Sequence, residues 1–233
     1  MKKSKWIKGL TIGLVVACVL CGCGQGDNVT TSQTTATSGN KGAAQSGGTD
    51  NVQNSSTSQD GETDTVLLSG KHRVNIIIKD KGTIKVELDA DAAPITVTNF
   101  VNLAKDGFYD GVVFHRIIED FMMQGGDPTG TGNGGSGTTI KGEFAINGVK
   151  NNLSHTRGAI SMARSSKNDS ASSQFFIVHE DSFHLDGQYA CFGYVTEGME
   201  IVDDICENTE GGDANGIIPE ANRPVIETIE VVD

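Results

Sequence analysis

The sequence predicts a mainly β domain that follows a long N-terminal extension of a different character. From Arg73 onward, short apolar runs with alternating polar positions recur between glycine-rich turns, which is typical of β-strands. Two segments have apolar residues at helical spacing instead. About eight strands with two helices indicate an antiparallel barrel or a sandwich, and the pattern alone does not separate these two architectures.

A β-hairpin and a helix are the first predicted elements. Apolar residues alternate along 74–78 and 84–88, and Lys81-Gly82 lies between the two runs, where a turn is needed. Pro94 then begins a stretch with helical spacing, and Gly107 is placed to end it after about three turns. Further strands are expected at 112–118, 121–124, 159–163, 175–179, 192–196 and 225–232, with a second helix at 199–206.

The N-terminal residues have the features of a secretory signal. Several lysines precede an apolar run over residues 10–20, which is shorter than the ~20 residues of a spanning helix. The run ends in Leu-Cys-Gly-Cys at 20–23, which resembles a bacterial lipobox. We interpret residues 1–23 as a lipoprotein signal peptide and Cys23 as the lipidated mature N-terminus. Cys18, which ends a Val-Val-Ala-Cys run, is a rival lipid acceptor.

Residues 24–66 differ in composition from what precedes and follows them. They are rich in Gly, Ser, Thr, Asn, Gln and Asp, with almost no large apolar side chain. Such a segment cannot bury enough surface to offset its ordering entropy, so a flexible tether is predicted. The folded domain then spans residues 67–233. We expect an extracytoplasmic protein that is anchored by lipid to the bacterial cell membrane.

The charge and the cysteine content narrow the classes of function. The formal net charge is -12, which disfavours a nucleic-acid partner because phosphate binding needs a basic face. The predicted domain contains two cysteines, Cys191 and Cys206. Two cysteines do not indicate a disulfide framework, so we expect buried thiols, although the sequence leaves a disulfide open.

Three ordered blocks of sequence carry the most information. The first is Phe-His-Arg-Ile-Ile-Glu-Asp-Phe-Met-Met-Gln-Gly-Gly-Asp at 114–127. The second joins 161–164 to 172–177, and the third joins 185–189 to 192–193. Together they resemble the cyclophilin family of peptidyl-prolyl cis-trans isomerases, over roughly Arg73 to Asp233. The resemblance implies a closed eight-stranded antiparallel β-barrel capped by two α-helices, and a monomer that acts on proline-containing polypeptides.

The chemistry of such an enzyme needs no nucleophile, metal or cofactor. Rotation about an X-Pro bond has a barrier of roughly 18–20 kcal/mol and takes about 10–100 s, so millisecond exchange requires removing about 6 kcal/mol. At the midpoint conjugation is lost and the proline nitrogen regains a lone pair. A donor aimed at that nitrogen stabilises this state alone. Arg116 is our catalytic candidate, because a guanidinium offers several N–H groups and stays charged.

The resemblance assigns roles to further residues. It implies that Gln124 orients Arg116 and contacts the substrate carbonyl. The proline pocket is implied to consist of Phe121, Met122, Phe176 and Leu185. The peptide is expected to lie as an extended strand along the backbone near the remaining predicted binding residues, Ala163, Arg164 and Gln174.

Two binding positions depart from the best-known eukaryotic members of the family. His184 stands where those proteins carry Trp, and Tyr189 stands where they carry His. Both departures are similar to the bacterial branch. Glu119-Asp120 replaces a commoner Pro-Gly pair in a turn, where we expect an effect on the loop alone.

Other motifs give weaker signals. Residues 130–135 match a GxGxxG string, but no βαβ unit surrounds it, so we interpret it as a glycine-rich loop. His179-Glu180 with His184 does not fit the HExxH spacing of a zinc site, and no GxSxG elbow supports a serine hydrolase.

We expect a folding catalyst for secreted or surface proteins. The alternative is a catalytically weak peptide-binding or chaperone module displayed on the membrane surface.

Overall fold

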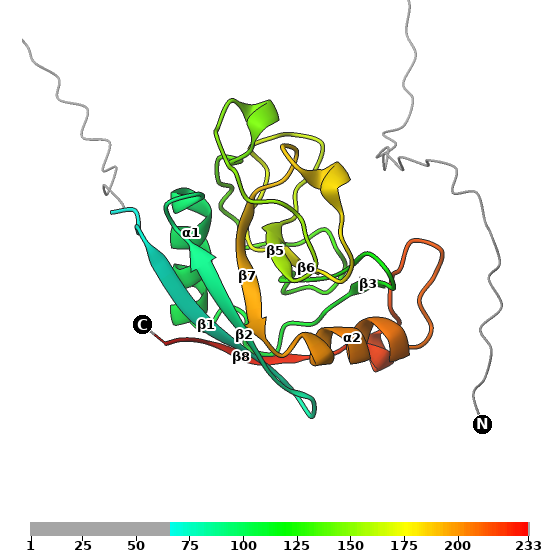
Figure 1. Ribbon diagram of the computed structural model, residues 1–233. Coiled ribbons are helices and arrows are strands. Elements are labelled where there is room, and N and C mark those ends of the chain that lie inside the picture. The colour runs from blue at the N-terminus through cyan, green and yellow to red at the C-terminus, as the bar shows by residue number, and fades with distance from the viewer. Residues whose placement is uncertain (1–65, 233) are drawn as a thin grey trace, which may run out of the picture. The chain divides into compact units, whose positions relative to one another are not determined.

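The computed structural model describes residues 66–232, which form one curled β-sheet with two α-helices (Figure 1). The predicted signal peptide, Cys18, Cys23 and the tether up to residue 65 lie outside the described residues. The strands are β1 (Lys71–Ile78), β2 (Gly82–Asp89), β3 (Arg116–Ile118), β4 (Met122–Gly125), β5 (Ala159–Met162), β6 (Phe175–Val178), β7 (Cys191–Glu197) and β8 (Ile226–Val231). The helices are α1 (Pro94–Lys105) and α2 (Met199–Asn208).

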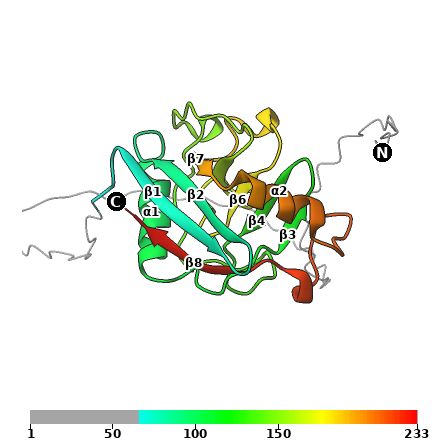
Figure 2. The same ribbon diagram turned by 60° about the horizontal axis from the view of Figure 1, so that its bottom comes forward.

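All eight strands belong to a single antiparallel sheet. Its order is β3-β4-β6-β5-β7-β2-β1-β8, and Figure 2 shows β8, β1 and β2 side by side. The expected mainly β architecture with two helices is therefore confirmed. Among the described residues no continuous ladder joins the edge strands β3 and β8; an isolated bridge, Val113 to Val225, joins the segments just before them. The sheet is curled but open in its pairing, so full closure of the barrel stays a prediction.

One predicted strand is much shorter in the structure than the sequence analysis indicates. The apolar run 112–118 gives a strand only at Arg116–Ile118. Upstream of this strand, Val113 forms one isolated β-bridge with Asp127 and another with Val225. The segment around Val113 therefore forms no continuous ladder with either neighbour. A run of apolar residues indicates burial, but a strand also needs a partner over several residues.

The two helices lie at opposite ends of the curled sheet (Figures 1 and 2). Pro94 begins α1, a position at which a backbone N–H has no partner within the helix, so the missing N–H of proline breaks no hydrogen bond. The Glu143 carboxylate accepts hydrogen bonds from the next two backbone N–H groups, those of Ile95 (3.0 Å) and Thr96 (2.7 Å). Helix α2 ends at Asn208, slightly beyond the predicted residue 206. No helix within residues 66–232 is long and apolar enough to cross a membrane.

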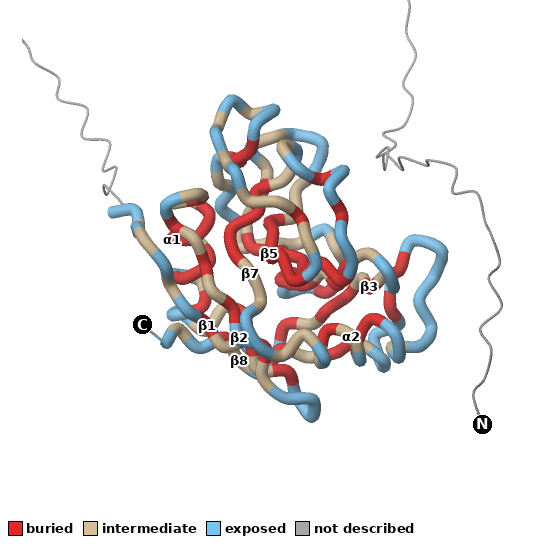
Figure 3. The backbone as a smooth tube through the Cα atoms, viewed as in Figure 1, coloured by how far each residue is buried: buried red, intermediate tan, exposed pale blue. Residues whose placement is uncertain are grey.

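An aromatic cluster fills the inside of the curled sheet. The Phe100 ring, from α1, lies 5.3 Å from Phe175 of β6 and 5.2 Å from Phe192 of β7, measured between ring centroids. Tyr109 packs 5.1 Å from Phe100, and all four residues are fully buried. Figure 3 shows the buried backbone concentrated along the central strands. Burial of these large rings supplies much of the driving force for folding.

Strands β4, β5 and β6 are buried on their outer face as well. Because successive side chains in a strand point to opposite faces, Phe175 enters the main core while Phe176 joins a second apolar cluster on the other side. The residues of that outer cluster are Met122, Ala159, Phe176, Val178, Leu185 and Cys191.

Cys191 and Cys206 are both buried free thiols, as expected.

Gly193 permits the close approach of β7 to β2. A Cβ added at this residue would lie 3.0 Å from the Leu88 Cα atom and closer still to the Glu87 carbonyl oxygen. Backbone atoms in a paired strand cannot move aside without breaking the ladder.

We therefore expect Gly193→Ala to lower the free energy of unfolding by about 3 kcal/mol, measured by urea denaturation. Gly212→Ala is the matched control, because its Cβ would first meet the flexible Ile218 Cδ1 atom at 3.2 Å. Equal stability of the two variants would contradict this account of β7 packing.

Candidate active site

A row of cross-strand partners forms the centre of the candidate site. Arg116 of β3 pairs with Gln124 of β4, Gln124 pairs with Phe176 of β6, and Phe176 pairs with Ser161 of β5. Partners that face each other across strands present their side chains on the same side of the sheet. Residues that are far apart in sequence therefore lie next to one another on the outer face.

Arg116 is held in place by neutral groups. Its Nε donates to the Asn215 carbonyl oxygen (2.8 Å), and its Nη1 donates to Gln124 Oε1 (3.4 Å) and lies 3.9 Å from the Met122 sulfur. Burial lowers the pKa of the guanidinium from its usual value, and the nearby Tyr189 and Asp213 partly oppose this effect. Within the described residues no carboxylate neutralises the charge by direct contact, so the cation is available to a bound molecule.

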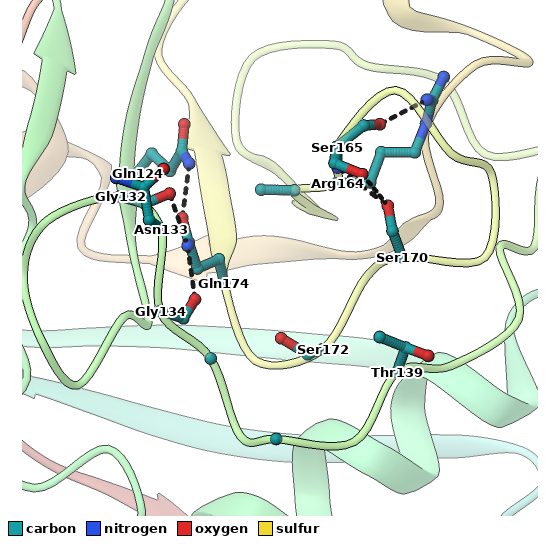
Figure 4. Close-up of a pocket in the computed structure, with 13 residues that line it drawn as sticks. Gln124, Gly132, Asn133, Gly134, Thr139, Arg164, Ser165, Ser170, Ser172 and Gln174 are labelled. Atoms are coloured by element: carbon teal, nitrogen blue, oxygen red, sulfur yellow. Dashed lines mark hydrogen bonds between the residues drawn. The ribbon is translucent and has the colours of Figure 1, made fainter. Parts of the chain in front are cut away.

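A chain of amide hydrogen bonds supports Gln124. Its Nε2 donates to Gln174 Oε1 (2.9 Å), as Figure 4 shows. Gln174 in turn donates through Nε2 to the carbonyl oxygens of Gly132 (3.1 Å) and Gly134 (2.8 Å). These bonds fix which amide atom is oxygen and which is nitrogen, so Gln124 presents its oxygen to Arg116.

The glycine-rich loop is organised around one buried carboxylate. Asp127 accepts hydrogen bonds from the backbone N–H groups of Thr129 (2.8 Å), Gly132 (2.6 Å) and Gly134 (3.1 Å), and from the Thr129 hydroxyl (2.8 Å). Burial alone raises its pKa, but these donors outweigh burial and lower the pKa from 3.8 to about 2. The loop is thus a structural support for Gln174.

A pocket of about 180 Å³ opens beside the Arg116 guanidinium. Every predicted site residue of the folded domain except Gln174 and His184 lines it: Arg116, Phe121, Met122, Gln124, Ala163, Arg164, Phe176, Leu185 and Tyr189. Met122, Phe176 and Leu185 are buried and form an apolar surface. The structure brings the predicted residues together, and their individual roles stay predictions.

The two remaining predicted residues lie just outside this pocket. Gln174 supports Gln124 from behind, as described above. His184 is exposed in a short 3₁₀ turn, Phe183–Leu185, with its ring centroid 5.6 Å from that of Phe121. His184 therefore extends the rim at Phe121.

Arg164 lies between this pocket and a larger one, and it lines both. Its guanidinium lies 5.0 Å from the Phe144 ring centroid and 4.8 Å from that of Tyr189, and its Nε donates to the Gln188 carbonyl oxygen (2.9 Å). These contacts occupy its charge, so the side chain serves as a wall. The N–H of Ala163 donates to the Gln174 carbonyl oxygen (2.9 Å), so a bound peptide can pair only with the carbonyl of Ala163.

The larger pocket has a volume of about 490 Å³ and is shown in Figure 4. It shares Gln124, Ala163 and Arg164 with the pocket beside Arg116, so the two are adjacent. The rest of its lining combines glycines with the hydroxyl and amide side chains of Asn133, Thr139, Ser165, Ser170, Ser172 and Gln174.

Comparison with known proteins decides the family. Residues 73–231 match the family described as cyclophilin type peptidyl-prolyl cis-trans isomerase/CLD. The chain belongs to the cyclophilin family. It is 48% identical over 137 residues to peptidyl-prolyl cis-trans isomerase B of Bacillus subtilis, a match that covers 59% of this chain and 90% of that protein. A peptidyl-prolyl cis-trans isomerase of Helicobacter pylori is 49% identical over 128 residues, or 54% of this chain and 76% of that protein.

Solved structures agree with this membership. A crystal structure of a Cryptosporidium parvum cyclophilin type peptidyl-prolyl cis-trans isomerase superposes with a TM-score of 0.62 at 32% identity. The match covers 70% of this chain and 99% of that protein. The predicted family and the predicted enzyme class are both confirmed: the chain is a peptidyl-prolyl cis-trans isomerase of the cyclophilin type.

Sequence reasoning missed several residues that support this cyclophilin site. Asp127 carried a local signal, because an Asp two residues before Thr in a glycine-rich run is typical of a turn that the carboxylate caps. Asn215 gave no signal, since its contribution is a backbone carbonyl. Gly216 follows it with a φ of +80°, and a Cβ there would lie 2.6 Å from the Ile117 carbonyl oxygen, so this loop approaches β3 closely.

The Glu119-Asp120 pair lies in the turn between β3 and β4, and its effect on the loop alone stays a prediction. Asp120 adopts a φ of +61°, a left-handed conformation that glycine takes more easily. Its N–H donates to His179 Nδ1 (3.0 Å), which ties the turn to the end of β6. Among the described residues, no group of three or more His, Cys, Asp or Glu side chains could hold a metal ion.

Asp127→Asn tests the support that the loop gives to the site. Because the folded carboxyl has a lowered pKa, its stabilisation is present above about pH 4 and is lost as the pH falls through about 2. We expect the variant to lose about 2 kcal/mol at pH 7 and to lack this part of the acid transition, as measured by urea midpoints from pH 7 to pH 2.

The same variant should lower kcat/KM, because Gly132 and Gly134 would no longer be fixed beneath Gln174. Glu227→Gln, at an exposed position of β8, is the control. An acid transition identical to that of the wild type would rule out Asp127 as its source.

Proposed function

We propose that this cyclophilin accelerates X-Pro rotation in secreted or surface polypeptides just outside the membrane of a bacterial cell, to which lipid on Cys23 attaches it. The catalytic part of this proposal rests on one observation: the Arg116 guanidinium lies beside the apolar surface of Met122, Phe176 and Leu185. The lipobox-like residues 20–23 and the apolar run before them support the anchoring.

The geometry favours the twisted amide over the planar one. The apolar pocket takes up the proline ring, while the peptide on its N-terminal side extends past Gln124 toward Ala163. A planar X-Pro amide has a large dipole, which is less stable beside an apolar wall than in water. When the bond twists, the proline nitrogen becomes a hydrogen-bond acceptor, and Arg116 is positioned to donate to it.

Arg116 needs no reorganisation at the moment of twisting. Nε and Nη1 are already bound to Asn215 and Gln124, so the plane of the guanidinium is set before substrate arrives. Within the described residues nothing accepts a hydrogen bond from Nη2, which leaves a donor for the substrate. Preorganised donors of this kind are an effective source of catalysis, since their orientation is fixed during folding.

Proline-containing peptides are the proposed substrates, and the protein is proposed to act as a monomer. The Cryptosporidium parvum relative was also crystallised in the presence of the dipeptide Ala-Pro, in a structure with a TM-score of 0.61 and 33% identity to this chain. The adjacent pocket of about 490 Å³ gives room for a side chain that precedes the proline.

Arg116→Ala tests the catalytic proposal. We expect it to lower kcat/KM for isomerisation of an X-Pro peptide by about 10²–10³-fold, because the donor to the proline nitrogen is lost. Arg116→Lys should recover little, since an ammonium cannot reproduce the planar contacts to Asn215 and Gln124.

The exposed Lys105→Ala variant of the full-length protein is the control and should match the wild type. If the wild-type protein gives no acceleration of isomerisation or of proline-limited refolding, the catalytic proposal fails and the peptide-binding alternative replaces it.

Cys23→Ser tests the proposed anchor. Cells that express the wild-type protein and are fed a labelled fatty acid should show label on it, and the variant should show none. Cys18→Ser should keep the label. Label that persists in the Cys23 variant and disappears in the Cys18 variant would move the acceptor to Cys18.

A further inference from the structure

A buried histidine connects the strand behind the proline pocket to the segment that forms its opposite wall. His155 is fully buried, and its Nδ1 lies 2.8 Å from Asp186 Oδ1. The same carboxylate oxygen accepts the His155 backbone N–H at 2.8 Å. On the other side of the ring, Nε2 lies 2.9 Å from the Ser161 Oγ atom of β5.

The direction of these hydrogen bonds follows from the groups themselves. Ionised Asp186 can only accept, so His155 Nδ1 carries the proton and donates. Burial lowers the pKa of His155 and favours a neutral ring, although Asp186 opposes this effect. In a neutral ring with a protonated Nδ1, Nε2 is an acceptor, so the Ser161 hydroxyl donates to it. The side chains thus form one directed chain from β5 to the surface.

This Ser-His-Asp order does not make a hydrolase. Ser161 has no exposed surface, and no substrate can reach its hydroxyl. A nucleophilic serine needs an accessible oxygen and a site for the reacting carbonyl. The arrangement therefore requires another explanation, and the neighbours of the imidazole ring supply one.

Both walls of the proline pocket touch this chain. The His155 ring lies parallel to Phe176, with 6.0 Å between centroids and 17° between planes. Phe176 meets Tyr189 edge to face at 5.9 Å. Leu185 directly precedes Asp186, and the Tyr189 N–H donates to the Leu185 carbonyl oxygen at 3.2 Å. Phe176 belongs to β6, whereas Leu185 and Tyr189 belong to the turn that Asp186 ties to His155.

We propose that His155 and Asp186 are positioning residues that set the separation of these two walls. The imidazole ring supports Phe176 on one side, and its hydrogen bond to Asp186 fixes the segment 185–189 on the other. Neither side chain lines the pocket, so both act through the residues that do. This inference rests on the function proposed above, in which the same pocket receives the proline ring.

Asp186 provides the test, because its side chain is 37% exposed and its replacement leaves no buried cavity. In the full-length protein, Asp186→Ala should lower kcat/KM for an X-Pro peptide by about 10-fold, since both bonds to His155 are lost. Asp186→Asn keeps an acceptor oxygen in place and should remain within about twofold of the wild type. Asp186→Glu keeps the charge but displaces it by one methylene, so it should fall below Asp186→Asn.

Ser154→Ala is the matched control. The Ser154 hydroxyl donates to the other oxygen of Asp186, Oδ2, at 2.6 Å, so this variant removes a bond of the same carboxylate without touching His155. It should lose stability but keep kcat/KM. The NMR signals of the Phe176 ring give a second readout, and they should shift in Asp186→Ala and in Asp186→Glu but not in Ser154→Ala.

The outcomes separate this inference from the proposed function. Wild-type kcat/KM and unchanged Phe176 signals in Asp186→Ala would overturn the positioning role and leave the isomerase intact. An equal loss in Asp186→Asn and Asp186→Ala would also overturn it, because charge would then matter and not the hydrogen bond. If the wild type were inactive, the proposed function would fail, and the Phe176 signals would still decide the positioning role. If Asp186→Ala does not fold, Asp186→Glu and Ser154→Ala make the same comparison.

Discussion

The site depends on strand β6 being buried on both of its faces. In an ordinary antiparallel sheet one face meets the core and the other meets water, but here Phe175 and Ile177 enter the aromatic core while Phe176 and Val178 pack on the outside. The inner residues hold the strand rigidly in the curled sheet. The outer residues can then serve as a fixed apolar surface for a ligand, because the strand cannot rotate without exposing its core face.

Polar groups near this surface are arranged by a single directed chain of hydrogen bonds. The Asp127 carboxylate folds the glycine-rich loop, the loop carbonyls orient Gln174, and Gln174 orients Gln124 against Arg116. Each member has its partner before substrate binds, so little reorganisation remains for the reaction itself. The loop that matched a nucleotide-binding string therefore serves the isomerase site by a different route, through its carbonyl oxygens.

The sequence predicted much of the fold, and the misses have physical causes. All eight strands and both helices lie where the apolar periodicity placed them, and the boundaries differ by a few residues. The strand expected at 112–118 shortened because Val113 is shared between two partners, which a local pattern does not report. The sequence did not predict the hydrogen bond from Arg116 to the Asn215 carbonyl oxygen or the contact of His155 with Asp186. Each of these contacts joins segments that are remote in sequence.

The sequence by itself determined which secondary-structure elements and which site side chains the protein contains. Residue types and their order identified the family, the strands and helices, and the side chains of the candidate site, because each depends on local spacing or on a motif. The tertiary structure alone decided the register that places Arg116, Gln124, Phe176 and Ser161 in one row. Strand register depends on pairing between distant segments, and shifting it by one residue would turn each side chain to the opposite face.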